Sequence, residues 1–429
     1  MSEFQKSNTS ITDSPISKFE EDFLKLERYA KSLSSFIQNS DTPITIGLQG
    51  EWGTGKTSLS IEINNILKKE LIKSDLLLNS FNKNYKYSYK KEILKKYKNF
   101  DIINLIGMGG SILGTEAIYD FLNFKIKKKI NFYNNLDSKI NFKNKKKTLN
   151  LIVSKSGNTL ETISNFNVIL NSQKKNKNIV ITEKKSSFLT ELGNKLKADI
   201  IEHKNYIGGR YSVLSEVGML PAELLGLNEI KFKRLNYLIK NKYFLNQLIY
   251  NVNFIFNCVS KGKKNSVILN YDESSNNLFK WYQQLTAESL GKDNKGIFPI
   301  ISSMPKDNHS LLQLYLDGPK NNFFTFFGII NEKTNKLSNK NLFDKFSILK
   351  NKNLNQIIKA QRDATKTVFK RKKIPFRSFE ILNRNEDTLG ELFTFFVLET
   401  ILLGRLMEVN PFDQPSVELI KTETSKLLN

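Results

Sequence analysis

Two short apolar runs in the chain each end in a turn that is rich in glycine and hydroxyl side chains. The first turn, Gly107–Ser111, follows Ile102–Ile106, and the second, Ser154–Thr159, follows Leu149–Val153. A strand, a tight turn and a helix in this order are typical of a parallel sheet that presents backbone N–H groups and a helix N-terminus to an anion. Two such turns in one unit predict a phosphate that is held from two sides. The hydroxyl groups that would add donors are those of Ser111, Ser154, Ser156 and Thr159.

The alternation of strands and helices continues along the chain and predicts the α/β class, with two doubly wound units over residues 101–250 and 251–429. Residues 71–100, which are rich in Lys, Asn and Tyr, are predicted to form a helical connector. The expected strands are Ile102–Ile106, Leu149–Val153, Asn178–Thr182, Asn265–Asn270, Phe298–Ser302 and Phe323–Ile329. The expected helices are Thr115–Leu122, Leu160–Leu170, Asn276–Ser289 and Leu389–Val409.

A separate glycine-rich turn near the N-terminus matches the pattern G-x-x-x-x-G-K-[ST] in full. Its fixed positions are Gly50, Gly55, Lys56 and Thr57, and an expected strand at Pro43–Leu48 precedes it. The local sequence, over residues 1–70, resembles the KAP family of P-loop NTPases. This resemblance implies nucleotide binding at the four fixed positions.

The P-loop-like segment lacks a convincing acidic residue to hold the Mg²⁺ ion that catalysis requires. ATP hydrolysis also needs an acid that holds Mg²⁺, and the one downstream candidate, Asp272, follows the expected strand Asn265–Asn270 of the second unit. We therefore interpret residues 1–70 as a P-loop fragment joined to an unrelated enzyme. ATP and Mg²⁺ are expected as ligands only if this segment is functional.

The amino-acid composition limits the kinds of partner that are expected for this chain. The net charge of +24 on 429 residues comes mostly from Lys, which is scattered among abundant Asn and Ile. An AT-rich coding sequence produces this pattern without nucleic-acid binding, and a basic field also attracts sugar phosphates. With Cys258 as the only cysteine and two histidines, neither a disulfide nor a His/Cys metal site is expected. The absence of a long apolar run or signal-peptide core predicts a cytoplasmic protein with no membrane or nucleic-acid partner.

Four later segments carry ionisable groups of the kinds that proton transfer uses. Arg210 follows Gly208-Gly209, Glu288 closes an expected helix, and His309 lies in Asp307-Asn308-His309-Ser310. Gln414 and Lys421 lie near the C-terminus. One carboxylate base, one imidazole, one guanidinium and one ammonium beside a phosphate cradle are suited to moving a proton on a phosphorylated sugar.

Taken in order, these segments resemble the glucose-6-phosphate isomerase family. The matching motifs are G-x-G-G-S, S-K-[ST]-x-x-T-x-E, G-G-R-Y-S, E-S-x-G-K, the histidine segment and F-D-Q-x-x-V-E-L-x-K, from about residue 75 to the C-terminus. The resemblance implies two three-layer αβα sugar-isomerase (SIS) domains. It implies an aldose–ketose isomerase of glycolysis and gluconeogenesis that requires no cofactor, binds a sugar phosphate and forms a homodimer with shared active sites.

The resemblance also assigns roles to individual residues. Glu288 would move a proton between C2 and C1, and Arg210, with Gly209 beside it, would stabilise the cis-enediolate. His309 and Lys421 would act in ring opening. The remaining roles fall to Gly110, Ser111, Ser154, Lys155, Ser156 and Thr159 on the phosphate, Gln414 on the substrate, and Glu161 as the acid that partners the histidine.

Three positions depart from the family pattern, and two other functions stay open. Leu290 replaces a common Asn, Pro415 replaces a common Trp, and Ser156 stands where many members have Thr, which affects substrate positioning rather than reaction class. One alternative is an ATP-hydrolysing NTPase of KAP type. The other is a sugar-phosphate sensor without turnover, against which the intact Glu288 argues because a sensor has no use for a base.

Overall fold

The structure is a computed structural model that describes residues 77–136, 147–172, 176–332 and 334–428. The chain divides into two compact units, Met1–Asp75 and Leu76–Asn429, and the described residues belong to the second. The P-loop match at residues 50–57, together with the predicted strand Pro43–Leu48, therefore lies outside the described residues.

The first sheet is parallel and has the strand order β2-β1-β3-β4-β5. Its central strands β1 and β3 are buried along their whole length, as expected for a parallel sheet covered on both faces. The strands are β1 (Ile102–Ile106), β2 (Lys129–Tyr133), β3 (Thr148–Val153), β4 (Lys177–Thr182) and β5 (Asp199–Glu202).

A row of asparagine amides crosses this sheet and fixes its register. The Nδ2 atoms of Asn131, Asn104 and Asn150 donate to the Oδ1 atoms of Asn104, Asn150 and Asn178 respectively, each over 2.9 Å. These residues pair directly across the strands. Each buried amide thus finds a partner, and a shift of one residue would leave the amides without their partners.

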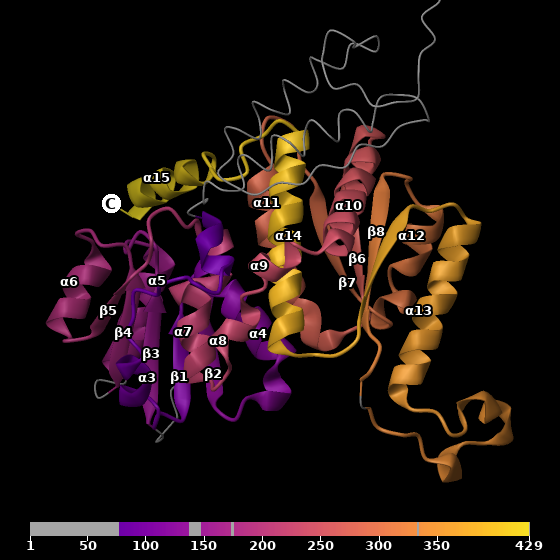
Figure 1. The fold of residues 1–429 in the computed structure, drawn as a ribbon, viewed down its shortest axis with the longest axis horizontal. Coiled ribbons are helices and arrows are strands. Elements are labelled where there is room, and N and C mark those ends of the chain that lie inside the picture. The colour runs from indigo at the N-terminus through magenta and orange to yellow at the C-terminus, as the bar shows by residue number, and fades with distance from the viewer. Residues whose placement is uncertain (1–76, 137–146, 173–175, 333, 429) are drawn as a thin grey trace, which may run out of the picture. The chain divides into compact units, whose positions relative to one another are not determined.

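Helices cover both faces of the first sheet (Figure 1). One face packs on α4 (Leu113–Phe121) and α7 (Glu216–Leu224) and on residues 87–100, and the other on α5 (Leu160–Ser172) and α6 (Phe188–Lys195). Each face has its own apolar cluster. The predicted three-layer αβα arrangement is therefore present.

The second sheet is also parallel, with the order β7-β6-β8-β9, and it too lies between two helical layers (Figure 1). Helices α12 and α13 cover one face, and α10, α11 and α14 cover the other. The strands are β6 (Asn265–Asn270), β7 (Phe298–Ser303), β8 (Asn322–Ile329) and β9 (Phe376–Ile381). The helices are α10 (Lys242–Ser260), α11 (Asn276–Leu290), α12 (Leu312–Asp317), α13 (Leu354–Arg371) and α14 (Glu386–Leu406).

The six predicted strands that fall within the described residues are all present, with bounds that move by at most one residue. The sequence missed β2, β5 and β9, which are edge strands. Edge strands are half-exposed and carry charged and polar side chains, so their hydrophobic pattern is weak. Helix α14 begins and ends three residues earlier than predicted, because Asn385 caps its start and Glu408 adopts a positive φ just beyond its end.

The prediction of a helical connector is wrong over the described residues 77–100. The segment contains only η2 (Leu77–Phe81) and α3 (Glu92–Lys96), each of five residues. Its tyrosines are the reason: Tyr89 and Tyr97 are buried in the core of the first sheet, and Tyr87 stacks on Tyr89. Residues spaced by two suit an extended chain on a surface rather than a helix.

Candidate active site

The two glycine- and hydroxyl-rich turns lie side by side at the carboxyl ends of β1 and β3. Ile106 pairs with Ile152, and a Cβ on Gly107 would lie 3.0 Å from the Val153 carbonyl oxygen. In the second turn Ser154 Oγ lies 2.8 Å from Thr159 Oγ1 and accepts a hydrogen bond from the Gly157 N–H. The structure therefore brings together the two predicted halves of the phosphate cradle.

Lys155 is held at the rim of this cradle by two groups that the sequence analysis did not identify. Its Nζ donates to the Asn205 carbonyl oxygen over 2.7 Å and lies 3.7 Å from a Glu183 carboxylate oxygen. Burial lowers the pKa of Lys155, and the Glu183 charge acts in the opposite direction. Ser156, next in the chain, is exposed and accepts from the Asn158 N–H.

Two glycines let the first turn touch the segment that carries Arg210. A Cβ on Gly110 would lie 2.1 Å from the Gly209 carbonyl carbon and 2.6 Å from the Arg210 nitrogen. Ser212 Oγ donates to the Gly110 carbonyl oxygen over 3.3 Å. The 3₁₀ turns η3 (Gly109–Ser111) and η5 (Gly209–Leu214) thus pack backbone to backbone, which only glycine permits at this distance.

Arg210 reaches from η5 to the end of helix α11. Its side chain is 3% exposed; Nε donates to Ser289 Oγ over 2.8 Å, and Nη1 lies 3.4 Å from Glu288 Oε2. The Tyr211 hydroxyl also lies 2.8 Å from Ser289 Oγ. The guanidinium plane is therefore fixed beside the Glu288 carboxylate.

The rest of the guanidinium binds the segment after α14. Nη1 donates to Gln414 Oε1 over 2.7 Å, and Nη2 donates to the carbonyl oxygens of Pro411 and Asp413 over 2.6 and 3.0 Å. Lys292 closes the same segment from the other side by an ion pair with Asp413 of 2.6 Å. Gln414 thus lies beside Arg210, and its own side chain is exposed; its predicted contact with the substrate stays a prediction.

Glu288 has a geometry suited to a base. Its side chain is 28% exposed, so one side of the carboxylate is open, and Oε1 accepts from Gln284 Nε2 over 2.8 Å. Gln284 also lies over the first phosphate turn, because a Cβ on Gly109 would be 2.7 Å from its Nε2. The sequence analysis missed Gln284, although its position one helical turn before Glu288 on the same face was a usable signal.

His309 lies at the other end of the second sheet. Leu290, two residues after Glu288, has its carbonyl oxygen 3.2 Å from a Cβ on Gly296, just before β7, whereas His309 follows the end of β7 in η7 (Lys306–His309). A six-residue strand spans about 17 Å. His309 is exposed there. Within one chain the structure does not bring it to Glu288.

Two other predicted residues lie in less constrained places. Glu161 is half-buried in the first turn of α5, directly after the phosphate turn. Lys421 is exposed in α15 (Val417–Leu428), seven residues beyond Gln414. Their assigned roles stay predictions.

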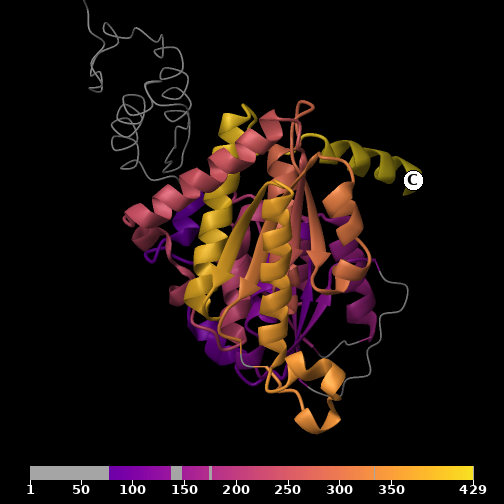
Figure 2. The same ribbon diagram turned by 90° about the vertical axis from the view of Figure 1, so that its right-hand side faces the viewer.

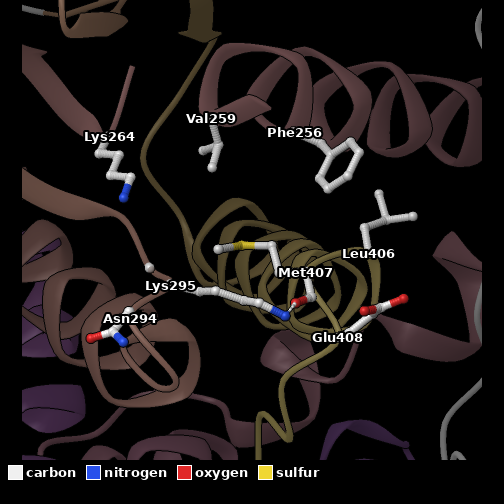
Figure 3. A pocket seen from close by; sticks show the side chains of 9 residues that line it. Phe256, Val259, Lys264, Asn294, Lys295, Leu406, Met407 and Glu408 are labelled. Carbon is white, nitrogen blue, oxygen red and sulfur yellow. Dashed lines mark hydrogen bonds between the residues drawn. The ribbon is translucent and has the colours of Figure 1, made fainter. Parts of the chain in front are cut away.

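A pocket of about 380 Å³ lies behind the end of α14 and contains none of the predicted site residues (Figure 3). Lys295 Nζ donates to the Met407 carbonyl oxygen over 2.9 Å across it. Its lining is Phe256, Val259, Lys264, Asn294, Lys295, Gly296, Leu406, Met407 and Glu408. Three of these residues, Leu406–Glu408, come shortly before the segment Asn410–Gln414 that binds Arg210.

Metal clusters and membrane-spanning helices are both absent from the described ranges. These ranges contain no group of three or more His, Cys, Asp or Glu side chains that could hold a metal ion. In the same ranges no helix has the length and apolar character needed to cross a membrane.

The chain is similar to known proteins in both sequence and fold. A family model for phosphoglucose isomerase matches residues 88–429. A probable glucose-6-phosphate isomerase of Methanococcus maripaludis is 33% identical over 398 residues, covering 84% of this chain and 85% of the relative. The glucose-6-phosphate isomerase of Campylobacter jejuni is 30% identical over 378 residues, covering 83% and 90%.

Solved structures support the fold at lower identity. A hypothetical protein of Thermus thermophilus superposes with a TM-score of 0.74 at 22% identity over 96% of this chain and 97% of its own. A glucose-6-phosphate isomerase from Chlamydia trachomatis gives a TM-score of 0.69 at 18% identity, over 94% and 84%. The family match begins at residue 88 and so leaves out the P-loop segment.

Proposed function

The chain belongs to the phosphoglucose isomerase family, and we propose that Glu288 is the base with which it interconverts glucose 6-phosphate and fructose 6-phosphate. It is an aldose–ketose isomerase of glycolysis and gluconeogenesis. The observation that carries the proposal is the meeting of Glu288, Arg210 and the phosphate turns at one place, through the contact of Gly110 with Gly209.

The phosphate of the sugar binds in the cradle between the two turns. The hydroxyl groups and backbone N–H groups there are donors, and Lys155 supplies a positive charge at the rim. The donors come from Gly110, Ser111, Ser154, Ser156 and Thr159. This grip is remote from the reacting carbons, so its binding energy serves to orient the sugar.

The carbon-to-carbon proton transfer uses Glu288 and Arg210. The Glu288 carboxylate removes the C2 proton of open-chain glucose 6-phosphate, and the electrons of the C–H bond form the cis-enediolate. A hydroxyl proton passes from O2 to O1, and the protonated Glu288 returns its proton to C1, which gives fructose 6-phosphate. Arg210, whose guanidinium lies 3.4 Å from Glu288, stabilises the negative charge that develops on oxygen. Gln284 holds the carboxylate in place by its 2.8 Å hydrogen bond.

The substrate neither gains nor loses electrons overall in these reaction steps, so we propose that the isomerisation requires no cofactor. We further propose that the protein works in the cytoplasm, where glycolytic sugar phosphates are formed and consumed. The P-loop segment would bind ATP and Mg²⁺ only if it were functional. Asp272 is a poor Mg²⁺ ligand for it, because its carboxylate is bound by Arg384.

We propose that ring opening uses Lys421 and a His309 that comes from a second subunit, with Glu161 as its acid partner. A homodimer accounts for two features of one chain: His309 is exposed, and it lies a strand length from Glu288. The segment of η8 (Asn339–Asn341) and η9 (Asp344–Leu349) extends below β8 in Figure 2. Its Phe343 and Ile348 side chains are about 80% exposed, and apolar side chains of this kind would be buried in a subunit contact.

Subunit mixing tests this arrangement. Glu288→Gln protein and His309→Ala protein, each inactive alone, are mixed under conditions that exchange subunits. Mixed dimers would carry one site with both residues intact, so activity is expected to return. If activity stays absent after exchange is demonstrated by mass spectrometry, His309 acts in its own subunit or has no role.

Exchange of the C2 proton tests Glu288 directly. Glutamine keeps the shape of the side chain and removes its basicity, so Glu288→Gln is expected to lower kcat by about 10²-fold or more while binding of fructose 6-phosphate changes little. Exchange of the C2 proton of glucose 6-phosphate with deuterated solvent is followed by NMR, beside a binding titration. Glu273→Gln, an exposed carboxylate just before the opposite end of α11, is the matched control.

Each outcome separates the candidate functions. Loss of exchange with retained binding, and full activity of the control, supports Glu288 as the base. Normal exchange in Glu288→Gln would assign the base elsewhere. Wild-type binding without any turnover would favour a sugar-phosphate sensor, and Mg²⁺-dependent release of phosphate from ATP would favour an NTPase.

A further inference from the structure

A lysine is buried against the C-terminal end of η5, the segment that carries Arg210. Lys233 follows α8 (Glu229–Phe232) and is 2% exposed. Lysine is almost never buried to this extent unless its charge is compensated. Among the described residues, no carboxylate lies within ion-pair distance of its Nζ. Something other than a salt bridge therefore holds the ammonium group.

The Nζ atom of Lys233 binds two backbone carbonyl oxygens and two aromatic rings. It donates to the carbonyl oxygens of Ser80 and Leu214. It also lies 5.0 Å from the ring centre of Tyr85 and 4.9 Å from that of Tyr87, within the range of cation–π attraction. The ammonium is thus a bridge between the segment 80–87 and the end of η5.

The bridged carbonyl of Leu214 is part of the active-site segment. Leu214 ends η5, the turn in which Arg210 is the second residue. Two residues after Leu214, Glu216 opens α7 and accepts hydrogen bonds from the Tyr85 hydroxyl and the Ser88 N–H. The same 80–88 segment therefore clamps both the end of η5 and the start of the next helix.

We propose that Lys233 is a positioning residue for Arg210: by binding the Leu214 and Ser80 carbonyl oxygens it fixes η5, and η5 sets the guanidinium against Glu288. The proposal rests on the function proposed above, in which Arg210 stabilises the enediolate. Arg210 is held in two ways, through its side chain and through the backbone of η5. Its own side chain binds Ser289 and Pro411, and its backbone is held at Gly110 on one side and through Leu214 on the other.

The charge state of Lys233 makes a neutral replacement practicable. Burial lowers its pKa to about 7, whereas the carboxylates of Glu216, Glu229 and Glu223 act in the opposite direction. Near neutral pH the ammonium is thus only marginally favoured. Methionine has a similar length and carries no charge, but it leaves the Ser80 and Leu214 carbonyl oxygens without their donor, at a cost of about 1–3 kcal/mol for each. This loss is smaller than the stability of a typical domain, so Lys233→Met is expected to fold.

The test compares Lys233→Met with Lys91→Met. Lys91 lies at the same junction and pairs with Glu223 and Glu229, but its side chain is 56% exposed and it does not bind η5. Lys233→Met is expected to lower kcat by about tenfold with KM within about twofold, because a displaced Arg210 weakens only the transition state. Lys91→Met is expected to keep kcat within about twofold of wild type.

Two further measurements distinguish positioning from stability. Arabinonate 5-phosphate carries a carboxylate where the enediolate forms, and sorbitol 6-phosphate does not. Lys233→Met is expected to lose affinity for the first by the factor lost from kcat and to bind the second normally. In an Arg210→Lys background the same Lys233→Met change is expected to cost less than about twofold, because the interaction it positions is already lost.

The outcomes are separable. If Lys233→Met keeps wild-type kcat while its unfolding temperature falls, Lys233 is structural and the proposal is wrong. Should Lys233→Met fail to fold, Lys233→Gln, which keeps N–H donors but cannot reach both carbonyls, must lower kcat by about threefold or more; unchanged kcat in that variant overturns the proposal. If Arg210→Lys itself leaves kcat unchanged, the function proposed for Arg210 fails instead.

Discussion

Gly110→Ala is the substitution whose consequence the structure defines most sharply. The added Cβ would lie 2.1 Å from the Gly209 carbonyl carbon and 2.6 Å from the Arg210 nitrogen, and both neighbours are backbone. Ordinary contact begins near 3.4 Å, so η3 and η5 must separate by about 1.3 Å (3.4 minus 2.1). This separation moves the first phosphate turn away from Arg210.

The magnitude follows from the catalytic geometry. A misplacement of about 1 Å between groups that act on one substrate costs about 10²-fold in rate, or about 2.7 kcal/mol of transition-state stabilisation. Gly110→Ala is therefore expected to lower kcat/KM for fructose 6-phosphate by about 10²-fold in a coupled assay that detects glucose 6-phosphate. Overpacking would also cost about 1–3 kcal/mol of unfolding free energy, measured by urea titration.

Gly226→Ala separates the loss of stability from the loss of catalysis. Gly226 follows α7 with a φ of +91° and has no atom within 4 Å of a new Cβ. Alanine there costs about 1–2 kcal/mol through backbone strain alone, so kcat/KM should stay within about twofold of wild type. If folded Gly110→Ala protein also keeps kcat/KM within about fivefold of wild type, the contact between η3 and η5 does not set the site geometry.

Two further predictions concern the N-terminal segment and a buried histidine. Lys56→Ala is expected to leave isomerase kcat/KM within about twofold, since Lys56 lies outside the family match, and a loss of about tenfold, worth about 1.4 kcal/mol, would show coupling to the active site. Burial lowers the pKa of His203 to about 4 in the folded protein, below its ordinary value of 6.5. The unfolded chain then binds more protons between pH 6.5 and 4, so the unfolding free energy decreases by up to about 3 kcal/mol as the pH is lowered through that window, and His203→Phe should flatten this dependence in urea titrations.

The sequence alone was sufficient to predict the central strands and the chemically active residue types on each segment. Apolar runs such as Ile102–Ile106 are buried on both faces, so their hydrophobic signal is continuous. Edge strands such as β5 were missed, because their signal is divided between core and solvent. The segment with Tyr85, Tyr87 and Tyr89 was wrongly predicted to be helical for a related reason. The sequence shows that these tyrosines are two residues apart, but it does not show the surface on which they pack.

The candidate site was also predictable only in part. The residue types of Arg210 and Glu288 were predictable from their motifs, but their 3.4 Å separation joins elements 78 positions apart in the chain. Nothing local in the sequence indicates which groups will meet across such a separation. For that reason Glu183, which holds Lys155 through a side-chain contact, emerged only from the structure. Gln284 is different, because it lies one helical turn before Glu288 and that spacing was a usable signal.

The second sheet explains why only one phosphate cradle is expected in the described unit. Its order, β7-β6-β8-β9, repeats β2-β1-β3-β4 of the first sheet, so the turns after β6 and β8 correspond to those after β1 and β3. At these positions stand Asp272 and Glu332, and Arg384 binds both carboxylates, over 2.8 Å in the case of Glu332. Ser275 Oγ donates to Asp272 as well.

An ion pair therefore occupies the place where the first sheet has its hydroxyl-rich and glycine-rich turns. Burial raises the pKa of Asp272, whereas Arg384 acts in the opposite direction and favours its charged form. A phosphate at this edge would displace Asp272 and Glu332 from Arg384 and leave two carboxylates beside an anion, which is unfavourable at short range. The same pairing removes Asp272 as a metal ligand for the N-terminal P-loop. Duplicated topology thus yields one edge at which a phosphate site is proposed and one edge closed by an ion pair, because side chains rather than strand order decide what binds at the carboxyl ends of a parallel sheet.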